Sequence, residues 1–203
     1  MSVEVSNTLI VTAKSSNNLD TILDSIKSCD SDFDFNKLIP MPDSLDILSG
    51  DLTQKAIEYR ENRDEKEMAD ILQVRGLSLD NFLEYRDKVL RNIELYGYPT
   101  WRPWREANWG CKLNASNVKI TREDNNAIIS FNTPNSVPRG IIKAFKRRFE
   151  IYLTSFVVNY SIEGDNSKYE FTDEVYDKIM DINVKGLFIF SQEVGRILVK
   201  NGK

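Results

Sequence analysis

The sequence predicts an α+β fold, a ferredoxin-like antiparallel sheet with helices on one face. Short β-branched runs are typical of strands, amphipathic stripes at helical spacing lie between them, and a charged helical region interrupts their order. Without that region the order approximates β-α-β-β-α-β. We therefore expect one domain over residues 1–165, a helical insertion at about 51–96, and a C-terminal helical extension over 166–203.

The first strand and helix follow from the N-terminal residues. Residues 8–13 are rich in β-branched side chains and predict a strand. Asn17 or Asn18 can cap the next helix, whose apolar stripe is spaced i, i+3, i+4 and i+7: Leu19, Ile22, Leu23 and Ile26. We expect residues 33–39 to be the second strand, or an extended segment packed on the core, because the prolines that follow remove backbone donors.

Residues 51–96 are charged, contain no proline and follow a helical pattern. Gly76 divides the region, Ser78 is a good N-cap for the last helix, and Gly97 is a good terminator for it. We interpret the region as a helical insertion whose charges form a solvated face.

The second half predicts a hairpin, a helix and a final strand. Residues 118–121 and 127–133 flank two asparagines that can turn the chain. A loop then leads into a helix, with Ser136 as its expected cap and Pro138 in its first turn. Residues 156–162 predict the last strand of the domain.

All three tryptophans lie within residues 101–112, which makes this stretch a candidate for both core and binding. An indole carries a large apolar surface and an N–H that needs a partner when buried, so the group predicts a local core. The alternative is a pocket for a nucleotide or a protein surface, because aromatic rings beside cations suit both. The candidate binding residues are Trp101, Arg102, Trp104, Arg105, Trp109 and Lys112.

A second candidate is the basic helix 139–148, which combines a buried apolar stripe with five cations. Such a helix can bind nucleic-acid phosphates, and Tyr152 and Tyr160 follow it as candidates for stacking on bases. The alternative is the solvated face of an ordinary amphipathic helix, which the acidic balance of the chain favours. The cations are Arg139, Lys143, Lys146, Arg147 and Arg148.

Composition argues against several kinds of chemistry. The chain has 203 residues, a net charge of −4 and no histidine, so histidine-based triads are excluded. Cys29 and Cys111 predict two reduced thiols, too few for a structural zinc site. We expect no enzyme, no metal and no cofactor. No apolar run is long enough to span a bilayer and no secretory signal is visible, so we expect a cytoplasmic protein without membrane association.

Four motifs stand in a fixed order along the chain: Ser6–Thr12, Phe33–Pro42, Trp101–Lys112 with its Asn-Trp-Gly core, and Ser130–Pro134 before Val137 and Pro138. Together they resemble the YubB-type ferredoxin-like proteins that phages and conjugative plasmids carry. The resemblance covers roughly Val5 to Gly164. The family pattern has aromatic residues at the position of Leu113 and in the loop 133–138, and this sequence does not. It implies a ferredoxin-like fold and a mobile-element origin, and it carries over no activity.

The tail resembles a different family. Residues 176–196 are similar to the central helix of short-chain dehydrogenases, and Asn183 stands at that family's helix asparagine. The glycine-rich turn and the Tyr-x-x-x-Lys motif of those enzymes are missing from the sequence, so a dehydrogenase-like fusion is the least favoured interpretation. The apolar stripe of the tail must pack on the main domain or on another copy of the chain, which would give a homodimer through the C-terminal helix.

The sequence as a whole favours a non-enzymatic binding or interaction protein encoded by a mobile genetic element. Its expected partner is another protein, such as a host or defence complex. A nucleic-acid-binding module that uses the basic helix 139–148 is the alternative.

Overall fold

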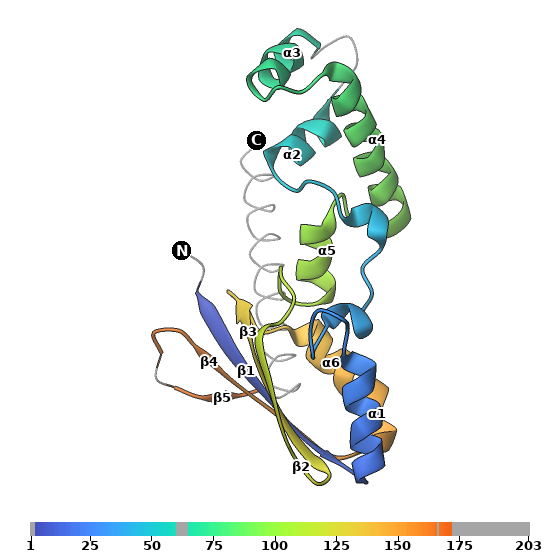
Figure 1. Cartoon of the computed structure of the whole chain (residues 1–203). Helices are drawn as coiled ribbons and strands as arrows, with labels where there is room; N and C mark the ends of the chain where they lie inside the picture. Colours follow the sequence, from blue (N-terminus) through green and yellow to red (C-terminus); the bar gives the residue numbers. More distant parts are fainter. Residues whose placement is uncertain (1–2, 60–64, 166, 172–203) are drawn as a thin grey trace, which may run out of the picture.

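The computed structural model describes residues 3–59, 65–165 and 167–171, and these form an α+β fold (Figure 1). Within the described residues, the strands form one antiparallel sheet in the order β2-β3-β1-β4-β5. The predicted fold class is therefore confirmed. The strands are β1 (Glu4–Ala13), β2 (Ser116–Glu123), β3 (Asn126–Pro134), β4 (Leu153–Ile162) and β5 (Tyr169–Glu170).

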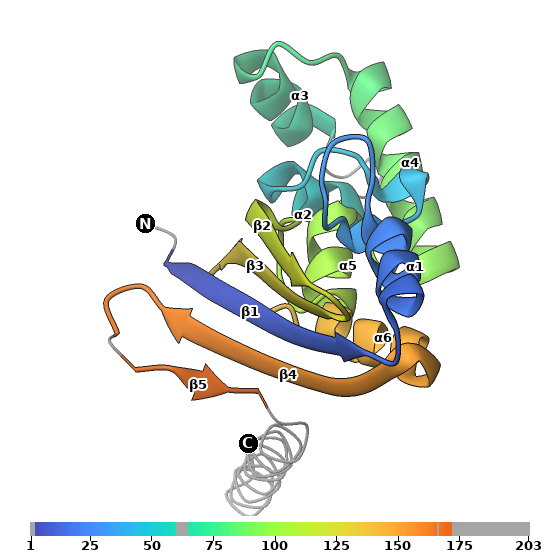
Figure 2. The same cartoon turned by 60° about the horizontal axis from the view of Figure 1, so that its bottom comes forward.

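The connections follow the predicted β-α-β-β-α-β order. Helix α1 (Ser16–Ile26) follows β1, the β2–β3 hairpin comes later, and helix α6 (Arg139–Phe149) precedes β4. Strand β1 is central because it pairs with β3 on one side and with β4 on the other. This is the split arrangement of the ferredoxin-like fold, and Figure 2 shows α1 and α6 on the same side of the sheet.

One face of the sheet is buried and the other is open. In β1, Val5, Leu9 and Val11 are at most 2 % exposed and alternate with more exposed positions. Successive side chains of a strand point to opposite faces, so a sheet with one covered face takes this pattern. On the open face, Ile10 pairs in register with Ile128, and both are more than a third exposed.

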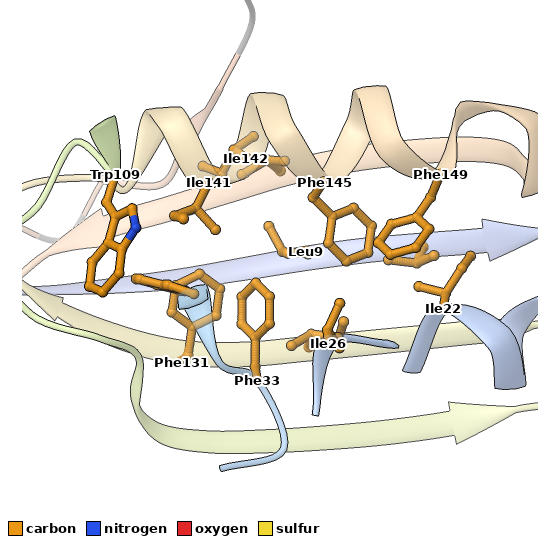
Figure 3. Packing of buried hydrophobic residues seen from close by; sticks show 14 of the residues in the cluster. Leu9, Ile22, Ile26, Phe33, Trp109, Phe131, Ile141, Ile142, Phe145 and Phe149 are labelled. Atoms are coloured by element: carbon orange, nitrogen blue, oxygen red, sulfur yellow. The ribbon is translucent and has the colours of Figure 1, made fainter. Parts of the chain in front are cut away.

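The core lies between the buried face of the sheet and helices α1 and α6 (Figure 3). Helix α1 contributes three of its four predicted apolar residues as fully buried side chains. Helix α6 contributes a stripe that meets Leu9 of β1 and Phe131 of β3 in the same cluster. The stripe consists of Ile141, Ile142, Phe145 and Phe149.

Two predicted helix caps are wrong. The cap residue of α1 is Ser15, whose Oγ accepts a hydrogen bond from the backbone N–H of Asn18. Neither of the two predicted asparagines is the cap. Pro138, and not Ser136, is the cap residue of α6. Ser136 Oγ donates instead to the Gly110 carbonyl at 2.8 Å, which ties the loop before α6 to the tryptophan stretch.

The prediction of a second strand at 33–39 is wrong. This segment contains a 3-10 helix, η1 (Phe35–Lys37), and the second strand of the split is β2. The side chains of Asp34 and Asn114 accept hydrogen bonds from backbone N–H groups of the segment and so take the place of a sheet ladder. The expected packing on the core is confirmed, because both phenylalanines of the segment are fully buried.

Helices α2 (Asp51–Glu58), α3 (Glu65–Val74) and α4 (Leu79–Tyr96) make up the region predicted as an insertion, which follows the short 3-10 helix η2 (Asp43–Leu45). Figure 1 shows these helices standing beyond one end of the sheet. Ser78 caps α4, and Gly97 ends it with a φ of +77°, as predicted. The helices share a hydrophobic cluster of their own: Leu52, Ala56, Tyr59, Met68, Leu72, Phe82 and Val89.

A buried amide joins the two chain segments that connect these helices to the sheet. Asn92 of α4 is 2 % exposed. Its Nδ2 donates to the carbonyl of Ser44 at 2.8 Å and to that of Pro99 at 3.3 Å. Because these carbonyls lie on the entering and the leaving segment, one side chain holds both ends of the region together.

The C-terminal end of the described chain differs from the prediction. Tyr169–Glu170 lies in the range predicted as a helical extension, but it forms strand β5 and pairs with β4. The predicted tail helix, its dehydrogenase-like stretch and the homodimer contact fall within residues 172–203 and lie outside the described residues. In the described part of the chain, no helix combines the length and the apolar character that crossing a membrane requires.

Candidate binding site around the tryptophan stretch

The tryptophan stretch begins with a short helix, α5 (Trp101–Asn108), which follows the cap residue Thr100. Pro103 is tolerated there because the first backbone N–H groups of a helix have no partner within it. The stretch turns at Gly110, which takes a φ of +86° that favours glycine. Figure 1 shows α5 between the sheet and the helices α2 and α4.

Two of the three tryptophans belong to the core. Trp109 is fully buried and Trp104 is 7 % exposed, and their rings meet edge to face at 6.1 Å. Trp109 Nε1 donates to the carbonyl of Ile39 at 2.9 Å, so its polar atom is satisfied. Trp101 is only half-buried. The predicted local core is therefore confirmed for Trp104 and Trp109.

The end of α5 also holds the start of α6 by backbone contact. The N–H of Gly140 donates to the Trp109 carbonyl at 3.1 Å, and that of Ile141 reaches the same oxygen at 3.5 Å. A Cβ at Gly140 would overlap the Asn108 carbonyl oxygen and lie 2.8 Å from its carbonyl carbon. The Asn-Trp-Gly motif, Asn108 to Gly110, thus forms the backbone surface on which the first turn of α6 packs, which we call the seat of α6.

Arg105 lies in the middle of an aromatic stripe on α5. Trp101, Arg105 and Trp109 are spaced four residues apart, which places them along one helix face. The guanidinium carbon lies 5.1 Å from the Trp101 ring centroid and 4.7 Å from that of Trp109. Both distances are within the range of cation–π contacts. Nε also donates to Met41 Sδ at 3.3 Å, so the orientation of the guanidinium is determined from three sides.

The electrostatics of Arg105 are those of a partly dehydrated cation. Burial lowers the pKa of its guanidinium from the ordinary value, and the charges of Asp46 and Asp34 act in the opposite direction. Within the described residues, no acceptor contacts its two terminal nitrogens. Neither terminal nitrogen is a buried atom without a partner in the part of the chain that the structure describes, so no described residue encloses the end of the guanidinium.

The other cations of the stretch have different surroundings. Arg102 lies on the exposed side of α5 and pairs with Glu106 at 3.1 Å. Lys112 is half-buried beside Cys111 in the chain. Burial raises the pKa of the Cys111 thiol to about 12, which makes it a poor nucleophile. Both cysteines are free, as expected, with Cys29 exposed and Cys111 buried.

The five cations of the basic helix do not form one surface. Lys143, Lys146 and Arg147 are exposed on the outer side of α6. Arg139 is half-buried, and its guanidinium lies 5.9 Å from the ring of Phe171. Arg148 donates to the carbonyl of Lys37 and so contacts the segment that follows α1.

The aromatic residues expected to stack on bases are engaged elsewhere. Tyr152 and Tyr160 are half-buried and pack against the main core. The Tyr160 ring also stacks on Tyr169 of β5, with centroids 5.2 Å apart. The structure joins α5 to the first turn of α6, whereas the exposed cations Lys143, Lys146 and Arg147 come later in that helix.

Sequence reasoning missed two contributors to the surroundings of Arg105. Met41 and Asp46 come from the segment after η1, more than fifty residues before α5 in the chain. The four-residue spacing of the aromatic stripe was visible in the sequence as a signal, but nothing local indicated the approach of Met41.

Comparison of the chain with protein-family models, with curated proteins and with solved structures finds no match in any of the three.

Proposed function

We propose that this chain is a non-enzymatic binding protein that docks on another protein through α5. The observation that carries the proposal is the guanidinium of Arg105, held by Trp101, Trp109 and Met41, with no described residue enclosing its terminal nitrogens. Tryptophan and arginine are the residues most enriched among those that dominate protein–protein binding energies. A side chain already fixed in position loses little conformational entropy when a partner binds.

We also propose that the protein works in the host cell of a mobile genetic element. The ordered motifs that resemble YubB-type proteins support an origin in a phage or a conjugative plasmid. A mobile element meets the proteins of its host, so we propose a host protein or a defence complex as the partner.

The test compares variants on the two sides of α5. The purified chain is immobilised and exposed to lysate of a bacterial host of the element, and retained proteins are identified by mass spectrometry. We expect Arg105→Ala to lose a protein that the unchanged chain retains. Arg102→Ala is the matched control, because Arg102 is an exposed cation of the same helix that pairs with Glu106. Equal retention by both variants would refute docking through Arg105.

Nucleic-acid binding through α6 is the second candidate. It is favoured by Lys143, Lys146 and Arg147, whose spacing of three and four residues gathers exposed cations on one side of the helix. The test is electrophoretic retardation of RNA and DNA at rising salt. Binding that weakens with salt and is lost in the triple alanine variant would support it. Unchanged migration at low salt would exclude it.

A further inference from the structure

The Arg105 guanidinium presents one open edge. Its Nε–H is engaged by Met41 Sδ, and two indole rings lie beside its central carbon. A carboxylate can pair with a guanidinium side-on, through Nε and one terminal nitrogen, or end-on, through both terminal nitrogens. Because Nε already has a partner and the terminal nitrogens have none among the described residues, the end-on mode is the one that remains.

The surrounding charges discriminate between anions. Asp46 and Asp34 are close enough to influence Arg105 electrostatically, and Arg102 is paired with Glu106. One carboxylate saturates the two end-on donors of a guanidinium. A phosphate dianion would gain no further donor from Arg105, but its second charge would be repelled by both aspartates. A singly charged, planar anion therefore fits the site better.

The half-buried ring of Trp101, whose centroid lies 5.1 Å from the guanidinium carbon, adds an apolar contact beside the cation. An aromatic ring at the margin of a cation offers packing surface to an aliphatic side chain of the same ligand. A free inorganic anion cannot use that surface, whereas a peptide with an acidic residue between aliphatic ones can use both the cation and the ring.

We infer that Arg105 binds the side-chain carboxylate of an acidic peptide segment, end-on, with an aliphatic neighbour of that residue on Trp101. The inference rests on the proposed docking role of α5 and specifies the chemistry of the partner. The acidic residue is an aspartate or glutamate of a protein, and not a phosphorylated residue or a nucleotide.

The test titrates three capped peptides into the full chain: acetyl-Leu-Glu-Leu-amide, its glutamine counterpart and its phosphoserine counterpart. NMR follows the Nε–H signal of Arg105 and the indole N–H signal of Trp101, which report weak binding at the site itself. We expect saturable shifts with the glutamate peptide, affinity at least about tenfold lower for the glutamine peptide, and no tighter binding of the phosphoserine peptide. Equal affinity for glutamate and glutamine, tighter binding of phosphoserine, or no saturable shift with glutamate would each overturn the inference.

Arg105→Lys separates bidentate recognition from charge. Lysine keeps the charge and an aliphatic stem but cannot present two parallel donors, so the preference for glutamate over glutamine is expected to fall severalfold without being lost. Arg102→Lys is the control and should leave the preference unchanged, with both variants checked for an unaltered melting temperature. A lysine variant that keeps the full preference would contradict the end-on geometry.

The two proposals can fail separately. If partner capture depends on Arg105 but the glutamate peptide does not bind, the docking role stands and the carboxylate inference is wrong. If capture is independent of Arg105, docking through α5 is wrong whatever the peptides do.

Discussion

Substitution of Gly140 by alanine tests the backbone contact between α5 and α6. The added Cβ would overlap the Asn108 carbonyl oxygen and lie 2.8 Å from the Asn108 carbonyl carbon and 3.2 Å from that of Trp109. All of these are backbone atoms, so no side chain can rotate out of the way. Carbon atoms normally stay about 3.5 Å or more apart, and the first turn of α6 must therefore move away from α5.

The cost can be estimated from what that movement breaks. The Trp109 carbonyl would lose the N–H donors of Gly140 and Ile141, at about 1 kcal/mol for each hydrogen bond. Overpacking of a core adds roughly 1–3 kcal/mol. Alanine is the better helix former by about 1 kcal/mol, which offsets part of this. The net expectation is a loss of roughly 2–4 kcal/mol in the free energy of unfolding.

The assay is urea denaturation followed by far-ultraviolet circular dichroism, with thermal unfolding as the second measurement. A loss of that size in a chain of this length lowers Tm by roughly 4–16 °C. Gly50→Ala is the matched control, because Gly50 has an extended backbone and no atom within 4 Å of a Cβ. Its expected cost is under about 1 kcal/mol. A Gly140 variant as stable as the unchanged chain would refute the close contact on which the seat of α6 depends.

Three further predictions concern buried polar atoms. Folding raises the pKa of the Cys111 thiol from 9.0 to about 12, so the stability that the buried neutral thiol contributes is complete below pH 9 and is lost as pH rises toward 12. A thiol reagent at pH 8 should label only Cys29 in the folded chain. Fast labelling of both cysteines would contradict the burial of Cys111. Trp109→Phe should lower the free energy of unfolding in urea by roughly 2–4 kcal/mol, because it removes a buried hydrogen bond and ring volume. The control Trp101→Phe should lower it by under about 1 kcal/mol. Similar losses for the two variants would be evidence against the core role of Trp109. Asn92→Ala should lower the free energy of unfolding by roughly 2–3 kcal/mol and speed hydrogen exchange of the backbone amides in α4, because two carbonyls lose their donor. Unchanged exchange would show that the Asn92 side chain does not hold the helical insertion in place.

Much of the fold was predictable because its signals are local. The helical spacing of Leu19, Ile22 and Ile26 predicted α1, and Ser78 and Gly97 marked the ends of α4. Residues 33–39 were assigned wrongly because an apolar segment near prolines is compatible with a strand or with a 3-10 turn. The 3-10 turn is stabilised by Asn114, whose side chain accepts a hydrogen bond from the backbone N–H of Phe35, 79 positions earlier in the chain.

The candidate site was predictable as a set of residues but not as an arrangement. The sequence grouped Trp101, Arg102, Arg105 and Trp109 as equivalent candidates. In the folded chain, Trp109 is core, Arg102 is paired on the outer surface, and Arg105 is oriented by two rings and a thioether. Helical spacing alone could have separated Arg102 from Arg105, but the contact with Met41 depends on the path of a distant segment.

The periodic elements, their order and their apolar faces follow from local sequence, because they depend on residues within a few positions of one another. Which tryptophans are buried, and which cation keeps donors without a partner among the described residues, depends on the folded chain. Burial and hydrogen bonding are set by neighbours that come from distant parts of the sequence. The carbonyl of Ile39 accepts a hydrogen bond from the indole N–H of Trp109, and Sδ of Met41 in the same segment accepts one from Nε–H of Arg105.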